Sequence, residues 1–234
     1  MSEEHRIAEV EIAAPRDVVW QALRDPVEIS RWFGWETPDI EAEVRMIFVD
    51  GAQADEGRGI IRFGEWEGVG DRFELGERNG RTVLSVVRTG APPEGGWEAS
   101  HDEVVEGWTS FIQQLRLYLE THRADTRRTL RFSSRTGPGA IEALGLIGVG
   151  AVGSHFAREL TPGDEVSGEV WFWSRHQVGV VVAEWGGGLL IAGDRPAGGT
   201  ALLTVYGLSD SEFEGLERRW RTWWEAAYAS VFER

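Results

Sequence analysis

A strand followed by a long amphipathic helix is predicted twice in this chain of 234 residues. The segment 80–87 reads Gly-Arg-Thr-Val-Leu-Ser-Val-Val, and the segment 198–205 reads Gly-Gly-Thr-Ala-Leu-Leu-Thr-Val. After each segment, apolar residues recur every three to four positions, over 104–119 and over 213–231, which is the pattern of a helix with one buried face. Such an arrangement favours sheets that each bury one face against a long helix.

The same start signal precedes both helical stripes. Ser100 is followed three residues later by Glu103, and Ser209 is followed three residues later by Glu212. This spacing is the capping-box signature, in which the serine and the glutamate satisfy free N–H groups of the first helical turn. We therefore expect the first long helix to begin near Ser100 and run to about Glu120.

A further echo lies upstream, where the segment 168–172 resembles the segment 59–63. Three echoes in the same order in both halves predict an internal duplication. We place the boundary in the arginine-rich link 122–128, which predicts one domain over residues 1–123 and a second, divergent domain over residues 124–234.

Short strands separated by Gly- and Asp-containing turns are expected between these landmarks. In the first half they are predicted at 43–49, 59–63, 71–75 and 82–88. In the second half, the first strand is expected at 130–134 and the first helix at 139–146.

The opening of the chain carries a second signature. A short apolar strand is predicted over 7–12, and Pro15 can open a helix because a first-turn residue needs no N–H donor. Asp25-Pro26 ends that helix, since the residue before a proline avoids the helical conformation. A second short segment then carries Trp32-Phe33-Gly34-Trp35.

Together with Gly107-Trp108 on the long helix, this opening resembles the family of homologues of the activator of Hsp90 ATPase. That family belongs to the START-like (SRPBCC), helix-grip superfamily. The resemblance covers residues 5–121 and is weaker over 126–234, where Trp32-Phe33-Gly34 has no counterpart. It implies an α+β fold of two tandem helix-grip domains, each a curved antiparallel sheet wrapped around a long C-terminal helix.

The resemblance also implies a hydrophobic cavity between the sheet and the long helix of the first domain. The residues expected to line it are aromatic or aliphatic: Trp32, Phe33, Phe48, Phe63, Phe73, Trp108, Ile112 and Leu115. The chain contains twelve tryptophans, and large rings either fill cores or line cavities. Core packing is therefore an equally good explanation for Trp32 and Trp108.

Arginines alternate with apolar residues on the predicted strands, at Arg45, Arg62 and Arg72. Because successive side chains of a strand point to opposite faces, all the arginines share one face. We expect that face to point outward, with Met46 and Phe48 toward the cavity, since an unpaired buried arginine is costly. The opposite register would place the arginines inside, where they could bind a carboxylate.

Composition limits the partners and the chemistry. The net charge is −15, which disfavours phosphate backbones and anionic membrane surfaces, so we expect neither nucleic acid nor a membrane as partner. No cysteine is present, which excludes thiolate chemistry and disulfides. The first residues are polar, with no signal-peptide run behind them, which predicts a cytoplasmic protein.

Two patterns that suggest cofactors or metals are better explained structurally. Residues 148–153 match G-x-G-x-x-G, but a dinucleotide site needs a strand before the motif and a helix after it, and here a helix is expected to precede it. A turn is the better interpretation. The five histidines form no metal-ligand spacing. We expect no cofactor, no metal and no catalytic set.

Three classes of function remain. The sequence favours a non-enzymatic protein that binds a hydrophobic small molecule. The first alternative is a START-like enzyme of the cyclase/aromatase or hydrolase type, for which the candidate titratable groups are Arg62, Glu74 and His101. The second is a chaperone cofactor or protein-interaction module, although an Hsp90-type partner is not favoured. Self-association is left open, because the two halves can mimic a homodimer.

Overall fold

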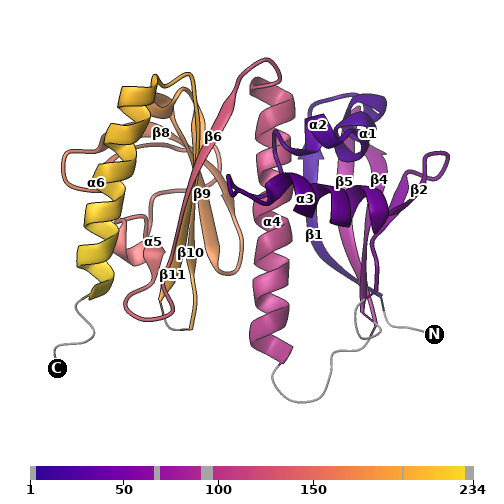
Figure 1. The fold of residues 1–234 in the computed structure, drawn as a ribbon, viewed down its shortest axis with the longest axis horizontal. Coiled ribbons are helices and arrows are strands. Elements are labelled where there is room, and N and C mark those ends of the chain that lie inside the picture. The colour runs from indigo at the N-terminus through magenta and orange to yellow at the C-terminus, as the bar shows by residue number, and fades with distance from the viewer. Residues whose placement is uncertain (1–3, 66–68, 91–96, 197, 230–234) are drawn as a thin grey trace. The chain divides into compact units, whose positions relative to one another are not determined.

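The computed structural model describes residues 4–65, 69–90, 97–196 and 198–229, without the side chains of 97–101 and 229. The chain divides into two compact units, Met1–Ala124 and Asp125–Arg234 (Figure 1).

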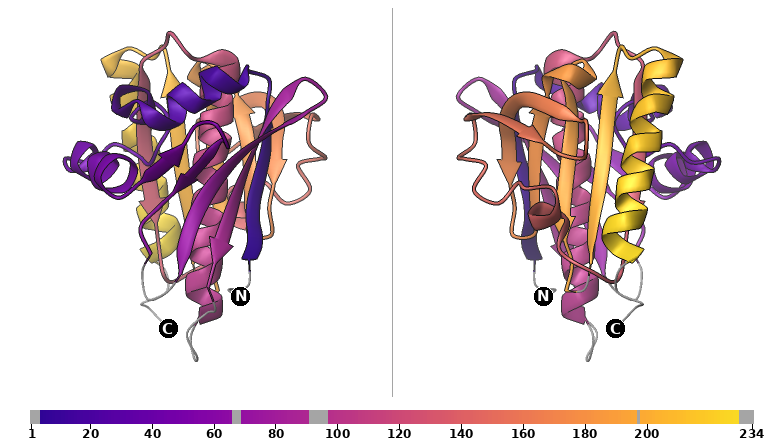
Figure 2. Two further views of the ribbon diagram at one scale, coloured as in Figure 1. Left: turned by 90° about the vertical axis from the view of Figure 1, so that its right-hand side faces the viewer. Right: turned by 90° about the vertical axis from the view of Figure 1, so that its left-hand side faces the viewer.

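The first unit is a five-stranded antiparallel sheet with the strand order β1-β5-β4-β3-β2. Its strands are β1 (Glu4–Ile12), β2 (Gln53–Asp55), β3 (Ile60–Arg62), β4 (Gly70–Arg78) and β5 (Arg81–Thr89). Its helices are α1 (Arg16–Arg24), α2 (Pro26–Ile29), α3 (Ile40–Val44), the π-helical η1 (Arg45–Asp50) and α4 (Trp97–Thr121). The strands twist across one another in the left-hand view of Figure 2.

Local sequence explains the turns of this unit. Asn79 and Gly80 connect β4 to β5 with φ values of 53° and 74°. Two consecutive residues with positive φ form the tight hairpin turn that matches strand twist, and Asn-Gly is its preferred sequence. As predicted, Asp25 ends α1; its carboxylate also accepts a hydrogen bond from the Val27 N–H, at 2.9 Å, and caps α2.

The second unit is a six-stranded antiparallel sheet with the order β6-β11-β10-β9-β8-β7. Its strands are β6 (Arg127–Ser133), β7 (His155–Glu159), β8 (Glu165–Trp173), β9 (Gln177–Val182), β10 (Gly188–Asp194) and β11 (Gly199–Tyr206). Its helices are α5 (Ala140–Ala143), the 3-10 helix η2 (Ala183–Trp185) and α6 (Asp210–Ala229).

Both units share one plan. The first strand pairs with the last, and the last strand leads into a long helix that packs on one face of the sheet (Figure 1). In the first unit, Leu115 and Tyr118 of α4 belong to the same buried core as the sheet; in the second, Leu216 and Trp220 of α6 do so. The expected α+β fold of two tandem helix-grip units is therefore confirmed.

The strand predicted at 43–49 is wrong, because this segment is helical in α3 and η1. Val44, Met46 and Phe48 alternate as in a strand, but Val44 and Phe48 also lie four residues apart, on one helix face. Both are buried, whereas Met46 is 62% exposed. The expectation that Met46 points to the core is wrong for the same reason.

Three smaller expectations also change. The first long helix begins at Trp97, so Ser100 lies inside it and is not its N-cap. The predicted helix at 139–146 is limited to α5. The segments 59–63 and 168–172 belong to β3 and β8, which are not equivalent strands. If both sheets are counted from the first strand of each unit, β3 is the fourth strand and β8 is the fifth, in the position of β2.

The capping box at the start of α6 is confirmed. The Ser209 N–H donates to the Glu212 carboxylate at 2.8 Å, and the Glu212 N–H donates to the Ser209 hydroxyl oxygen at 3.4 Å. Hydrogen bonds from the Ser209 hydroxyl and N–H lower the pKa of Glu212 below its ordinary value.

Within the described residues, no helix is long and apolar enough to cross a membrane.

The buried carboxylate of Asp164, just before β8, is hydrogen-bonded to the long helix of the second unit. Asp164, which is 7% exposed, accepts a hydrogen bond from the Trp220 indole N–H at 2.9 Å and lies 3.4 Å from the Arg219 guanidinium. Trp223, on the same helix, makes no hydrogen bond to the part of the chain described here, although its ring packs against Trp220 and Trp224.

Replacing Trp220 by phenylalanine tests the hydrogen bond between its indole and Asp164. Trp220→Phe leaves a buried carboxylate without one of its donors, so we expect the free energy of unfolding to fall by about 2 kcal/mol. Trp223→Phe is the matched control and is expected to cost less than about 1 kcal/mol. Urea denaturation followed by circular dichroism measures both, and equal effects would contradict a specific role for the indole bond.

Glu212→Gln tests the capping box through pH. Because the folded-state pKa of Glu212 is lowered, its ionised form stabilises the folded protein above the unfolded-state pKa, and this contribution disappears as pH falls through the folded-state pKa. We therefore expect wild type to exceed Glu212→Gln in stability at pH 7 and the gap to close at acidic pH. A gap in urea midpoint that does not change with pH would refute the assignment.

Candidate functional site

The eight residues predicted to bind a ligand come together in the first unit. They all lie in the core between the sheet and α4: Trp32, Phe33, Phe48, Phe63, Phe73, Trp108, Ile112 and Leu115. Phe63 and Trp108 are only partly buried, and the other six are buried.

Aromatic rings fill this part of the core. Phe48 packs edge-on against Phe33 and Phe63, with ring centroids 4.9 and 5.4 Å apart. Phe63 in turn packs edge-on against Phe73 at 4.8 Å and is stacked on Trp108 at 5.4 Å. The predicted residues thus contact one another, and whether any of them touches a ligand stays a prediction.

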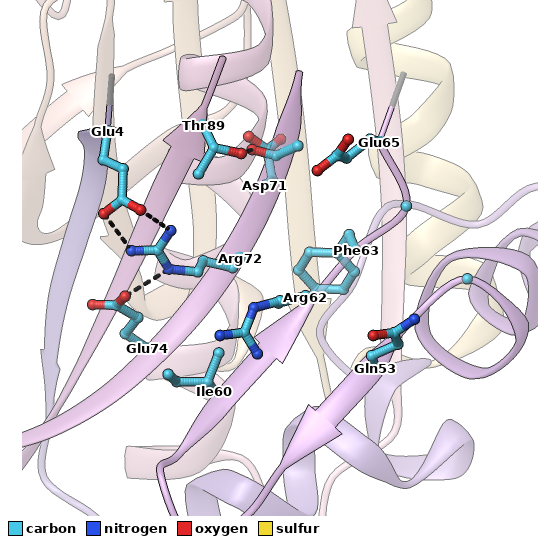
Figure 3. Close-up of a pocket in the computed structure, with 13 residues that line it drawn as sticks. Glu4, Gln53, Ile60, Arg62, Phe63, Glu65, Asp71, Arg72, Glu74 and Thr89 are labelled. Carbon is cyan, nitrogen blue, oxygen red and sulfur yellow. Dashed lines mark hydrogen bonds and ion pairs between the residues drawn. The ribbon is translucent and has the colours of Figure 1, made fainter. Parts of the chain in front are cut away.

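A cleft of about 1270 Å³ opens at the edge of this core (Figure 3). It lies where β3 ends and β4 begins, and Phe63 is the predicted residue that lines it. The described lining residues are Glu4, Gly51, Gln53, Ile60, Arg62, Phe63, Gly64, Glu65, Gly70, Asp71, Arg72, Glu74 and Thr89. Most of these side chains are polar or charged, and Phe63 is the aromatic residue among them.

Three charged side chains of the cleft wall are bonded to one another. Arg72 donates two hydrogen bonds to the Glu4 carboxylate, at 2.8 and 3.0 Å, and a third to Glu74 at 2.7 Å (Figure 3). The hydrogen bond to Glu4 raises the pKa of Arg72, and the same bond lowers the pKa of Glu4. Both carboxylates therefore hold Arg72 in one orientation.

A buried cluster holds the inner wall. Asp71 of β4 accepts two hydrogen bonds from Arg88 of β5, at 2.6 and 2.7 Å, and one from the Trp108 indole N–H at 2.8 Å. The side chains of Asp71 and Arg88 are 13% and 8% exposed. One carboxylate thus fixes the Trp108 ring, and the Trp108 ring supports Phe63 from behind.

Arg62 has no hydrogen-bond or ion-pair partner in the described part of the chain. It lies directly opposite Arg72 across β3 and β4, and directly opposite Gln53 across β2 and β3. Figure 3 shows its guanidinium over the cleft, apart from the network of Glu4, Arg72 and Glu74. Gln53 and Glu65 likewise have no partner among the described residues.

The arginines on strands take the expected outward register. Ile61 is buried in the core, whereas Arg62 is exposed and Arg72 lies on the same face of the sheet. Arg45 lies in η1 and pairs with Asp50 at the surface, at 3.3 Å.

Of the three enzyme candidates, Arg62 and Glu74 line the cleft. The side chain of His101 lies outside the described residues.

Several lining residues were not foreseen from the sequence. Glu4 and Asp71 accept hydrogen bonds from Arg72 and Arg88, which lie more than fifteen positions away in the sequence. Once the register of β4 and β5 is known, Asp71 falls directly opposite Arg88, but the spacing of residues along the chain does not reveal that register.

In the portion of the chain that the structure describes, no three His, Asp or Glu side chains lie together as metal ligands. The glycine motif at 148–153 forms a turn, as expected, with positive φ at Gly148, Gly150 and Gly153.

Comparison with known proteins gives likenesses among solved structures. No protein-family model matches the chain, and no curated protein matches it. The di-domain ARO/CYC BexL from the BE-7585A biosynthetic pathway is 11% identical, with a TM-score of 0.39, over 97% of this chain and 98% of its own. DynU16, from the dynemicin biosynthetic locus, is 19% identical, with a TM-score of 0.32, over 96% of both chains.

The Aha1 protein of Colwellia psychrerythraea, solved as a dimer in solution, is 14% identical, with a TM-score of 0.37, over 53% of this chain and 99% of its own. TM-scores below 0.5 leave the function to be argued from the site itself.

Asp71→Asn tests the buried cluster. The change removes the negative partner of buried Arg88, so we expect the free energy of unfolding to fall by about 3 kcal/mol. The matched control is Asp50→Asn, which breaks the exposed pair with Arg45 and is expected to cost less than about 1 kcal/mol. Urea denaturation compares them, and a small loss for Asp71→Asn would show that the cluster does not stabilise the unit.

Proposed function

We propose that this chain is a START-like protein that binds a hydrophobic small molecule in the cleft of its first unit. The observation that carries the proposal is that Phe63, whose ring packs on the aromatic core, lines a cleft whose other walls carry polar groups. Small-molecule sites combine apolar surface with a few polar groups that orient the ligand, in volumes of roughly 300–1,000 Å³. A cleft of about 1270 Å³ is large enough for such a ligand.

The site we propose is displaced from the one that the sequence suggested. The space between sheet and helix is occupied by rings in mutual contact, so the ligand rests against the edge of the aromatic core. Phe63 contacts it directly, and Phe73 and Trp108 support Phe63 from behind. Burial of apolar ligand surface on Phe63 provides the main driving force for binding.

The second candidate is a START-like enzyme of the cyclase/aromatase or hydrolase type. The observation in its favour is that Arg62 and Glu74 both line the cleft. Because Glu74 accepts a hydrogen bond from Arg72, it is less available as a general base, which favours binding without turnover. Recovery of a chemically altered compound after incubation with the protein would favour the enzyme.

Membership of the family of activator-of-Hsp90-ATPase homologues is part of the same proposal, and it rests on the sequence pattern of residues 5–121. A cytoplasmic location, the absence of nucleic-acid and membrane partners, and self-association also stay proposals. A role as chaperone cofactor is the least favoured, since the cleft suits a small molecule rather than a protein surface.

A neutral fluorescent probe tests the site. We expect N-phenyl-1-naphthylamine to bind and its emission to rise as it enters the cleft. Gly64→Leu is expected to weaken binding about tenfold, because a Cβ at Gly64 meets, among the described residues, only the Gly51 carbonyl oxygen within 4 Å, at 3.8 Å, and so extends into the cleft.

Gly76→Leu is the matched control, since Gly76 lies on β4 outside the described cleft lining and a Cβ there meets no atom of the described residues within 4 Å. Its affinity for the probe should equal that of wild type. Absence of probe binding to wild type, or equal loss in both variants, would refute the cleft as the binding site.

A further inference from the structure

We propose that Arg62 selects ligands that carry one anionic group, so that the cleft takes an aromatic or apolar monocarboxylate. This inference rests on the proposed function and specifies its ligand class. The pairing of the charged side chains in the cleft supports it.

The other charged groups have partners, with one exception. Glu4 and Glu74 share Arg72, and Asp71 is paired with Arg88. Glu65 and Arg62 remain without partners among the described residues. The cleft therefore offers a ligand one guanidinium, that of Arg62, which has no bonded partner among the described residues.

The position of Arg62 makes an anion favourable there. Arg62 lies directly opposite Arg72 on the neighbouring strand, where Glu4 and Glu74 already pair with Arg72. Arg72 has carboxylates on two sides, but neither of them forms a bond to Arg62. A ligand carboxylate beside Arg62 can form a two-pronged hydrogen-bonded pair with its guanidinium.

Neighbouring groups complete the site. Gln53 lies opposite Arg62 on β2, and its amide N–H can donate to the same carboxylate. Phe63 follows Arg62 in the chain and lines the same cleft, so a ring attached to the carboxylate can lie against Phe63. Figure 3 shows Gln53, Arg62 and Phe63 bordering one opening.

The remaining charge limits the ligand to a single negative charge. Glu65 lies on the other side of Phe63 from Arg62 (Figure 3), and the chain carries a net charge of −15. A dianion such as a phosphate monoester meets repulsion from Glu65 and from the overall field. A monocarboxylate with an apolar body places its only charge on Arg62.

Calorimetric titration with 2-naphthoate and its neutral isostere 2-naphthamide tests the inference. Charge-assisted hydrogen bonds favour the acid, so we expect wild type to bind 2-naphthoate about tenfold more tightly than 2-naphthamide. Arg62→Gln should abolish this preference while leaving the affinity for 2-naphthamide unchanged. Arg58→Gln is the matched control, since Arg58 is 74% exposed and does not line the cleft, and it should retain the preference.

The outcomes separate this inference from the proposed function. Equal affinities of wild type for acid and amide, or a preference that survives Arg62→Gln, would overturn the role of Arg62 while the neutral probe still reports a working cleft. If 2-naphthoate does not bind although N-phenyl-1-naphthylamine does, the monocarboxylate assignment is wrong and the cleft stands. If none of the three compounds binds, both the cleft and the role of Arg62 are overturned.

Discussion

The hydrogen-bonded cluster of Asp71, Arg88 and Trp108 holds the first unit together where its site forms. One carboxylate on β4 joins a guanidinium on β5 to an indole on α4, so two strands and the long helix share a single anchor. A buried charge tolerates few geometries, because each lost hydrogen bond leaves an unsatisfied group. The orientation of the Trp108 ring is set in this way, and the ring supports Phe63 at the edge of the cleft.

In the second unit, too, a buried carboxylate accepts a hydrogen bond from a tryptophan of the long helix, but other residues form the bond. Asp164 precedes β8 rather than lying in a strand next to the last, and its indole partner is Trp220. If Gly215-Leu216 of α6 is aligned with Gly107-Trp108 of α4, Trp220 falls about one helical turn beyond the position of Trp108. A helix that packs on a sheet through apolar contacts alone can slide, and a carboxylate–indole bond fixes its position along the sheet. Both units have such a bond, but it lies at different positions along the two long helices.

The filled core explains why the site lies at an edge. Strand alternation places Arg62 and Phe63 on opposite faces of the sheet, so within a continuous strand they cannot face one ligand. β3 ends at Arg62, the Phe63 N–H still donates to the Asp71 carbonyl oxygen at 2.9 Å, and both residues line the cleft at this edge of the sheet. The cleft at this edge is thus lined by a cation of the outer face, Arg62, and by a residue of the core face, Phe63.

Patterns of short range predicted local structure in some places and failed in others, as at Ser100, which lies inside α4 and is not its N-cap. The Ser209–Glu212 capping box and the Asp25-Pro26 helix end were correct because each depends on residues a few positions apart. The segment 43–49 satisfied both strand and helix patterns, and packing of Phe48 against Trp32 and Phe33 distinguishes them. Those contacts join residues about fifteen positions apart, which a local pattern does not contain.

The sequence by itself determined two sheets, each with a long helix, an aromatic core in the first unit and arginines on the outer face of its strands. These properties follow from periodicity and composition along the chain. Only the tertiary structure decided that the rings fill the core, that Arg72 pairs with Glu4 and Glu74, and that Arg62 is left facing a cleft. The physical reason is that charge pairing depends on strand register, which brings Glu4 to Arg72 across 68 positions of sequence.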